Sequence, residues 1–305
     1  MEKLLDNIIQ TNRKYVEEGE VASYIPELKK GNKNDLGVYV TTLNGEEFSA
    51  GDYETRFTIQ SISKVISLII AIMDNGEDYV FSKVGVEHTA DAFNSITNLE
   101  TKNLHRPSNP MINAGAIAIV SLIKGREPDE VFERILNFTR KITGNDNINI
   151  NREAYISEKA TGDRNRSLAY FMKSTGVITN DVEKVLDVYF KQCSMEVTCK
   201  DISRIGAFLA NDGVIPLTGE KVIPRETARI VKAIMTTCGM YDASGEFAVN
   251  IGMPAKSGVG GGIMAVAPEK MGIGVVGPSL DKKGNSIAGI KVLADLSKEL
   301  ELSIF

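Results

Sequence analysis

The sequence predicts an α/β (α+β) fold in which one antiparallel sheet is built from both ends of the chain. Segments with strand character lie near both termini, and segments with helical periodicity fill the middle. This order is typical of a sheet flanked by helices and carrying a helical insertion. We therefore expect a single domain over residues 1–305, with the sheet from about 20–60 and 250–305 and the helical part from about 75–240.

The N-terminal part is expected to supply a helix and a hairpin. Apolar residues recur at helical spacing from residue 2 to 19. Asn44-Gly45 is a strong hairpin signal that follows a run rich in β-branched and apolar residues. Asp74-Asn75-Gly76 ends a further helix. The elements expected here are helices over 2–19 and 61–73 and strands over 36–43, 46–50 and 57–60.

Helical patterns dominate the middle of the chain, and strands return near its end. Pro128 is a favoured first-turn residue of a helix. Thr198 and Asp201 resemble a capping box, with the helix ending near Asn211-Asp212-Gly213. The other expected elements are helices over 114–124, 128–144, 181–192, 225–237 and 286–300 and strands over 262–267 and 272–277.

Composition narrows the function class. The net charge of −5, from 35 basic and 40 acidic residues, does not favour a nucleic-acid-binding protein. Three cysteines without a C-x-x-C pair and only two histidines suggest neither a disulfide framework nor a metal centre, so they are interpreted as structural. The N-terminus does not resemble a signal peptide, and the longest apolar stretch, 65–73, is too short to cross a membrane. We expect a soluble, cytoplasmic protein.

The motif S-x-x-K occurs three times, and its context differs each time. Ser279 and Lys282 lie in a glycine-proline turn, which gives no fixed spacing between the two side chains. Ser121 lies at the C-terminal end of its expected helix, where the helix dipole disfavours a developing anion. Ser61 and Lys64 alone lie at a strand-to-helix junction. Ser61 is therefore the predicted nucleophile of a serine hydrolase.

Chemistry at this junction supports the assignment. Residues three apart on a helix share a face, so Lys64 can reach the Ser61 hydroxyl. The helix N-terminus favours an alkoxide and an oxyanion. The apolar stretch after Lys64 desolvates the amine, which lowers its pKa and makes it usable as a base. The alternative is that Ser61 is a helix cap and Lys64 a snorkelling surface lysine.

A second motif, Lys256-Ser257-Gly258, leads into the expected strand at 262–267. It matches the K-[ST]-G box that accompanies S-x-x-K in penicillin-recognising hydrolases. There a strand edge supplies a backbone N–H opposite that of the nucleophile, and the pair forms an oxyanion hole. The alternative is a flexible glycine hairpin, which the presence of both boxes in the right order makes the less favoured interpretation.

Several longer segments resemble one family, the serine-dependent glutaminases. The resemblance covers roughly residues 20–295. The segments that carry it are YIPEL at 24–28, QS at 60–61, NPMINAGAI at 109–117, SEKATGDRN at 157–165, YFKQCSMEVTC at 189–199, CGMYDASG at 238–245 and PAKSGV at 254–259.

The resemblance implies hydrolysis of L-glutamine to L-glutamate and ammonia by a β-lactamase-like (transpeptidase-like) fold. It implies no metal and no organic cofactor, and a homo-oligomer, either a dimer or a tetramer. Position by position, Ser61 resembles the nucleophile, Lys64 the adjacent base and Tyr241 a proton relay, with the amides of Ser61 and Val259 as the oxyanion hole. The substrate would be held by these groups and by Tyr24, Asn113, Glu158, Asn165 and Tyr189.

The chemistry of these residue types agrees with the implied roles. Glutamine's α-amino group is a cation that Glu158 can pair with. Its carboxylate needs donors, which the amides of Asn113 and Asn165 and the hydroxyl of Tyr189 can provide.

Each residue also has a structural interpretation. Asn113 is an N-cap, Tyr189 a core residue, Glu158 a surface acid, Asn165 a turn residue and Tyr241 an exposed loop aromatic.

Two rival functions remain open at this point. One is a penicillin-recognising β-lactamase or D-alanyl-D-alanine peptidase, against which the absence of a Ser-Asp-Asn element and of an export signal counts. The other is a non-catalytic ligand sensor on the same scaffold. Whether Lys64 or Tyr241 takes the serine proton also stays open, because interacting bases titrate as a unit.

Overall fold

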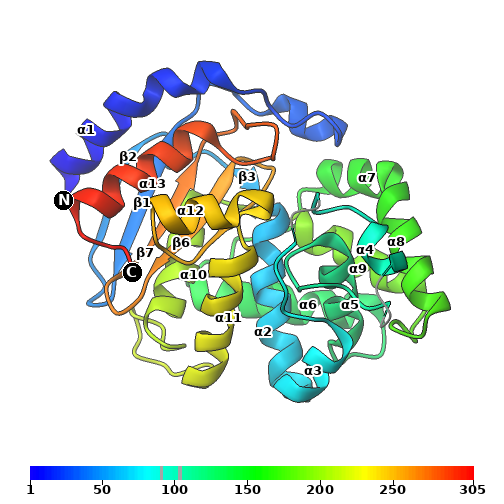
Figure 1. Ribbon diagram of the computed structural model, residues 1–305. Coiled ribbons are helices and arrows are strands. Elements are labelled where there is room, and N and C mark those ends of the chain that lie inside the picture. The colour runs from blue at the N-terminus through cyan, green and yellow to red at the C-terminus, as the bar shows by residue number, and fades with distance from the viewer. Residues whose placement is uncertain (90–91, 102–104) are drawn as a thin grey trace.

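A computed structural model describes residues 1–89, 92–101 and 105–305 of the chain. One side of the molecule is a five-stranded antiparallel sheet with helices on both faces, and the other side is a cluster of helices (Figure 1). The sheet contains β1 (Gly37–Thr42), β2 (Glu47–Gly51), β5 (Ala255–Ser257), β6 (Gly262–Ala267) and β7 (Met271–Val276), and a separate pair is formed by β3 (Phe57–Thr58) and β4 (Glu196–Val197).

Helices make up most of the remaining chain. They are α1 (Glu2–Asn12), α2 (Ser63–Asn75), α3 (Glu77–Lys83), α4 (Thr97–Thr101), α5 (Asn113–Leu122), α6 (Pro128–Thr143), α7 (Arg152–Thr161), α8 (Asp163–Ser174), α9 (Val182–Cys193), α10 (Cys199–Ala210), α11 (Arg225–Cys238), α12 (Ser244–Asn250) and α13 (Ile287–Glu299).

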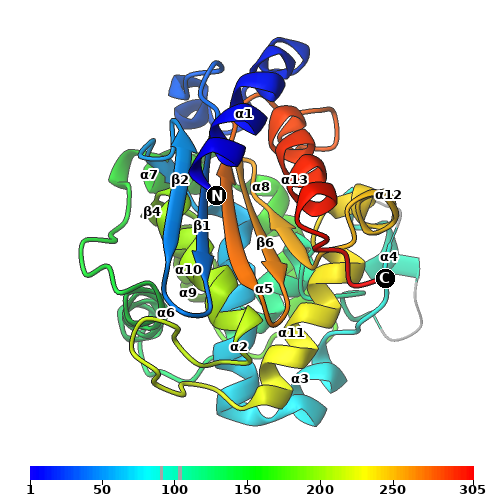
Figure 2. The same cartoon turned by 90° about the vertical axis from the view of Figure 1, so that its left-hand side faces the viewer.

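The strand order β2-β1-β7-β6-β5 places the two ends of the chain side by side in one sheet (Figure 2). Tyr39 of β1 pairs with Gly274 of β7. All neighbouring strands are antiparallel. The fold class predicted from the sequence is therefore confirmed, while the assignment of residues 1–305 to a single domain stays a prediction.

The sheet is buried on both faces, which explains why its strands read as continuous apolar runs. Ile263 and Ala265 of β6 pack into the cluster under α1 and α13, whereas Met264 and Val266 pack into the cluster on the opposite face. This alternation follows from the two-residue repeat of a strand. On the second face, a Cβ at Gly272 would lie 2.0 Å from the α10 backbone at Ala207, so only glycine permits this approach.

Most expected elements are present, and several have shifted boundaries. The first helix ends at Asn12 and continues as a 3₁₀ turn over Arg13–Glu18. The helix expected from Ser61 begins at Ser63, because Gln60–Ile62 forms a 3₁₀ turn. The capping box of Thr198 with Asp201 is confirmed. Within the described part of the chain, no helix has the length and apolar character that a bilayer crossing requires.

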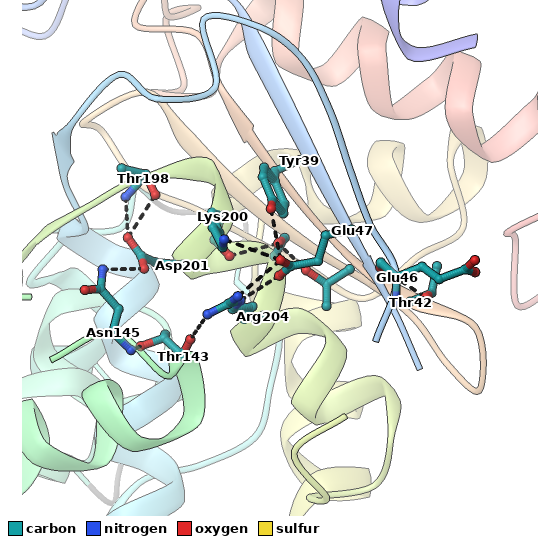
Figure 3. A network of polar contacts seen from close by, with 12 residues as sticks. Tyr39, Thr42, Glu46, Glu47, Thr143, Asn145, Thr198, Lys200, Asp201 and Arg204 are labelled. Atoms are coloured by element: carbon teal, nitrogen blue, oxygen red, sulfur yellow. Dashed lines mark hydrogen bonds and ion pairs between the residues drawn. The ribbon is translucent and has the colours of Figure 1, made fainter. Parts of the chain in front are cut away.

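A polar network joins the sheet to the helices (Figure 3). Glu47 on β2 accepts two hydrogen bonds from Arg204 on α10, at 2.7 and 3.1 Å, and one from the Tyr39 hydroxyl at 3.1 Å. Arg204 also donates to the carbonyl of Thr143 at the end of α6, at 2.6 Å. Burial alone would raise the pKa of Glu47, but the hydrogen bonds and charge of Arg204 outweigh it and lower that pKa.

Replacing Arg204 with Met should destabilise the fold by about 2–3 kcal/mol, because Glu47 is left partly buried without its main partner. Urea unfolding at pH 7 measures this loss. The double variant E47Q/R204M removes the unpaired charge and should recover part of it. Because folding lowers the pKa of Glu47, the pair stabilises fully above the unfolded value of about 4.3 and less as pH falls below it. An R204M effect that stays equally large at pH 3 would contradict this account.

Candidate active site

Ser61 lies in the 3₁₀ turn that joins β3 to α2, where it is largely buried. The preceding residue, Gln60, has a φ of +46°, a conformation that is costly for a side chain of its size. Local hydrogen bonds hold it there: Ser63 Oγ donates to the Gln60 carbonyl at 2.7 Å, and Gln60 Nε2 donates to Thr58 Oγ1 at 3.3 Å. Such strain at a turn beside a reactive hydroxyl is typical of functional sites.

Lys64 has no exposed surface. Its Nζ donates to the carbonyl of Met111 at 3.1 Å and to Asn113 Oδ1 at 2.7 Å. Burial lowers the pKa of Lys64 to about 8, although the opposing charges of Cys193 and Glu158 would raise it. The interpretation of Lys64 as a snorkelling surface lysine is therefore wrong, and the predicted desolvation is more complete than expected.

Asn113 is the first residue of α5 and not its N-cap, which is Ile112, so the capping interpretation is wrong. The side chain of Asn113 connects two other predicted site residues. Its Oδ1 accepts from Lys64, and its Nδ2 donates to Asn165 Oδ1 at 3.0 Å. The side-chain amide of Asn113 therefore hydrogen-bonds to other site residues and does not cap its own helix.

Tyr241 is buried in a 3₁₀ turn and has a φ of +55°, so it is not an exposed loop aromatic. Its hydroxyl donates to the carbonyl of Ser257 at 3.1 Å, and the neighbouring Ser61 side chain acts to lower the pKa of the tyrosine. Burial raises the pKa of Tyr241 well above its usual value, so the hydroxyl stays protonated. The structure thus brings the predicted relay residue to the predicted nucleophile.

Lys256 lies under the Tyr241 ring, with its Nζ 4.4 Å from the ring centroid. The side chain has no exposed surface, and Nζ donates to the carbonyls of Gly239 at 2.9 Å and Ser257 at 2.7 Å. Burial, together with repulsion from Lys64, lowers the pKa of Lys256 well below its usual value. The sequence singled out Lys256 only as part of a motif, and its contact with Tyr241 was not predicted.

The segment after Lys256 lies directly against the turn that holds Ser61. A Cβ at Gly258 would be 2.9 Å from the carbonyl oxygen of Ile59 and 3.5 Å from the Gln60 side chain. The segment therefore needs a glycine at this point. Val259 follows immediately and packs with Tyr241 and Leu280.

A pocket opens beside Ser61 and gathers most of the predicted substrate residues. Glu158 is only 5% exposed and Tyr189 only 2%, so neither is a surface group, while Tyr24 is 56% exposed. Phe93 also contributes, and its ring stacks on Tyr241 at 4.9 Å. The pocket is lined by Tyr24, Ile25, Gln60, Ser61, Phe93, Asn113, Glu158, Thr161, Gly162, Asn165, Tyr189 and Cys193.

Glu158 is the most unusual group in this pocket. Burial raises its pKa to about 8, against the opposing effects of hydrogen bonds with Gln60 and Cys193 and of the Lys64 charge. Its Oε2 is buried and has no hydrogen-bond partner among the described residues. An orphaned carboxylate oxygen in a pocket indicates that a cationic group or donor binds there.

The family model described as Glutaminase matches residues 19–305. The chain belongs to the glutaminase family. A glutaminase of Clostridium tetani (strain Massachusetts / E88) is 69% identical over 305 residues, which are 100% of both chains. Among solved structures, a probable glutaminase from Bacillus subtilis complexed with 6-diazo-5-oxo-L-norleucine is 42% identical, with a TM-score of 0.91 over 99% of this chain and 95% of that one. A second solved structure, of the B. subtilis glutaminase YbgJ in a covalent complex with 5-oxo-L-norleucine formed from the same compound, is 42% identical, with a TM-score of 0.91 over 100% of this chain and 99% of that one.

Membership of the glutaminase family confirms the resemblance seen in the sequence and leaves the penicillin-recognising rival without support. The pocket residues that sequence reasoning missed in this glutaminase are Ile25, Gln60, Phe93, Thr161, Gly162 and Cys193. Only Cys193 had a usable signal, because it lies one helical turn after Tyr189 and therefore on the same face of α9.

Replacing Lys256 with Met should lower the activity of this glutaminase without destabilising it. Both carbonyls that accept from Lys256 keep another donor: Ser257 N donates to Gly239 O, and the Tyr241 hydroxyl donates to Ser257 O. Removing a buried amine of this kind is neutral or stabilising, while Tyr241 loses the amine that packs against its ring. We expect an unchanged or higher Tm and an at least tenfold lower kcat/KM. A large fall in Tm would show that Lys256 is a structural residue.

Proposed function

We propose that the protein hydrolyses the side-chain amide of L-glutamine to L-glutamate and ammonia through an acyl-enzyme on Ser61. The observation that carries this proposal is the gathering, around one pocket, of a buried serine, a buried lysine with a lowered pKa and a buried carboxylate with an orphaned oxygen. The covalent complex of the B. subtilis glutaminase with an L-amino-acid ketone supports a nucleophile in the same fold.

The substrate's charged end binds at the Glu158 side of the pocket. The α-ammonium group pairs with Glu158 Oε2, which keeps the carboxylate ionised in the complex. Because Asn165 Oδ1 already accepts from Asn113, the amide nitrogen of Asn165 is the atom left to donate to the α-carboxylate, together with the Tyr189 hydroxyl. Tyr24 closes the pocket from its exposed position. A site built from such polar groups discriminates against substrates that lack the matching charges.

Lys64 is the base for the first step. A neutral amine has two N–H groups and one lone pair, and the two acceptors Met111 O and Asn113 Oδ1 engage both N–H groups. The lone pair is then left for the Ser61 proton. With a pKa of about 8, about a tenth of Lys64 is neutral at pH 7. Two fixed acceptors thus orient the base before substrate arrives.

Ser61 Oγ attacks the amide carbon, and the carbonyl oxygen becomes an oxyanion held by the Ser61 and Val259 amides. Collapse of this tetrahedral intermediate breaks the carbon–nitrogen bond. The nitrogen takes its proton from the Tyr241 hydroxyl, which burial keeps protonated. Water then attacks the acyl carbon and gives one proton to the Tyr241 phenolate, and the departing Ser61 oxygen takes back the proton that Lys64 holds. A homo-oligomer, dimer or tetramer, stays a prediction from the family resemblance.

The proposal is tested by ammonia release from L-glutamine. Wild type should turn over, and Ser61→Ala and Lys64→Ala should each lose at least a thousandfold in kcat, because nucleophile and base act as one unit. Unchanged activity in Ser61→Ala would overturn the mechanism. Binding of glutamine by wild type without turnover would establish the ligand sensor instead.

The pH profile tests the roles of Lys64 and Glu158. Catalysis requires neutral Lys64 and ionised Glu158, and both groups have a pKa of about 8 because of burial. We therefore expect kcat/KM to rise with pH up to about 8–9. The apparent pKa values of this limb belong to Lys64 and Glu158 together, because the two groups interact. Steady-state kinetics between pH 6 and 10 measure this limb. A profile that is flat from pH 6 to 9 would contradict the assignment.

A further inference from the structure

A second cavity, which we call the side groove, adjoins the substrate pocket, and the mechanism above gives it no role. The side groove has a volume of about 440 Å³ and is lined by the segment 18–24, the loop 280–284, Phe93 and Val259. Tyr24 and Phe93 line both the side groove and the pocket that contains Ser61. The two cavities therefore meet at these two aromatic residues.

The side groove lies on the side of the site where the leaving nitrogen takes up its proton. Tyr241 packs with Val259 and Leu280, and both of these residues line the side groove. The ring centroid of Phe93 is 4.9 Å from that of Tyr241, and a Cβ at Gly284 would be 3.6 Å from Tyr241 Cε2. Because Tyr241 gives its proton to the leaving nitrogen, a substituent on that nitrogen would extend toward the side groove.

Backbone hydrogen bonds fix the wall of the side groove. The N–H of Glu20 donates to the carbonyl of Leu280, and the N–H of Leu280 donates to the carbonyl of Glu20, each at 3.0 Å. This pairing joins the two chain segments that line the side groove. A ligand group would thus enter a cavity whose backbone is already ordered, which lowers the entropic cost of binding.

The lining of the side groove favours an uncharged, apolar group. Ala22 and Leu280 add apolar surface to that of the two aromatic rings, and an alkyl or aryl group gains free energy by burial against them. A carboxylate would meet more negative than positive charge. The charged residues of the lining are three acids and two lysines, namely Glu18, Glu20, Asp281, Lys282 and Lys283.

The opposite end of the substrate pocket is closed to such a group. Glu158 is only 5% exposed and Tyr189 only 2%, and both lie outside the side groove. A group on the α-amino nitrogen would have to fit among these buried side chains. Acylation of that nitrogen would also remove the positive charge that pairs with Glu158 and leave the carboxylate buried without a partner.

We propose that the protein also hydrolyses γ-N-substituted glutamines, in which an alkyl or aryl group on the side-chain amide nitrogen occupies the side groove. The inference rests on the proposed function and extends its substrate class from the primary amide to secondary amides. The same carbon–nitrogen bond breaks, the nitrogen takes its proton from Tyr241, and a primary amine leaves in place of ammonia. Water then hydrolyses the acyl-enzyme, so the products are L-glutamate and the amine.

The test measures the ammonia or benzylamine that wild type releases from L-glutamine, γ-N-benzyl-L-glutamine and α-N-acetyl-L-glutamine. The kcat/KM for the benzyl amide should lie within about tenfold of that for L-glutamine, because burial of the ring offsets the loss of an N–H group. The kcat/KM for the α-N-acetyl compound should be lower by at least about a thousandfold. Ammonia release from L-glutamine without benzylamine release from the benzyl amide would overturn the inference. Failure of the proposed function is distinct, because L-glutamine would then release no ammonia.

Ala22→Trp tests whether the benzyl group occupies the side groove. The indole fills part of the cavity, so kcat/KM for the benzyl amide should fall at least about tenfold, while that for L-glutamine stays within about twofold. Leu217→Trp is the matched control, since it adds the same side chain at an exposed position outside the side groove. It should leave both substrates unchanged. Undiminished hydrolysis of the benzyl amide by Ala22→Trp, or an equal loss for both substrates, would overturn the assignment of the side groove.

Discussion

The burial of the Lys64 amine is the constraint on which the rest of the site depends. An ammonium group removed from water without a carboxylate bonded to it is costly, so its pKa falls and the neutral form becomes available. Two carbonyl-type acceptors, Met111 O and Asn113 Oδ1, offset part of this cost. Asn113 is one of these acceptors, and through it the amine is connected to Asn165. A carboxylate in place of Asn113 would neutralise the effect by raising the pKa again.

Two residues of the candidate active site have a strained backbone. Gln60 and Tyr241 both adopt positive φ values, although neither is glycine. Each is the first residue of a 3₁₀ turn, and the hydrogen bonds and packing of that turn keep the backbone in this conformation. The turn of Gln60 packs against α2, α9, β5 and β6, and the turn of Tyr241 packs against α12. The backbone strain of Gln60 and Tyr241 is thus offset by the packing of the surrounding core, as is common at functional sites.

Local sequence signals predicted the parts of the fold that local chemistry determines. The hairpin at Asn44-Gly45 formed because Gly45 accepts a positive φ, and the box of Thr198 and Asp201 capped α10. Helices α7 and α8 were not predicted individually, since each buries few side chains and shows little periodicity.

The candidate site also contains residues that local sequence predicted and features that depend on tertiary packing. Ser61 and Lys64 could be selected by their spacing and position at a junction. The burial of Glu158 and the packing of Lys256 on Tyr241 could not, because they arise only when segments far apart in the chain approach one another.

The pairing of β1 with β7 also constrains how the chain is made. Tyr39 leaves the ribosome long before Gly274, its partner in the sheet, so the β1–β2 hairpin must wait with an unpaired apolar edge until the last strands are synthesised. Contacts between such distant residues form slowly because a long loop has to close first. An exposed strand edge during this interval is a site at which nascent chains associate wrongly. A nascent chain that stops before residue 271 therefore lacks the central strand of its sheet, and we expect the cell's chaperones and proteases to recognise it as incomplete.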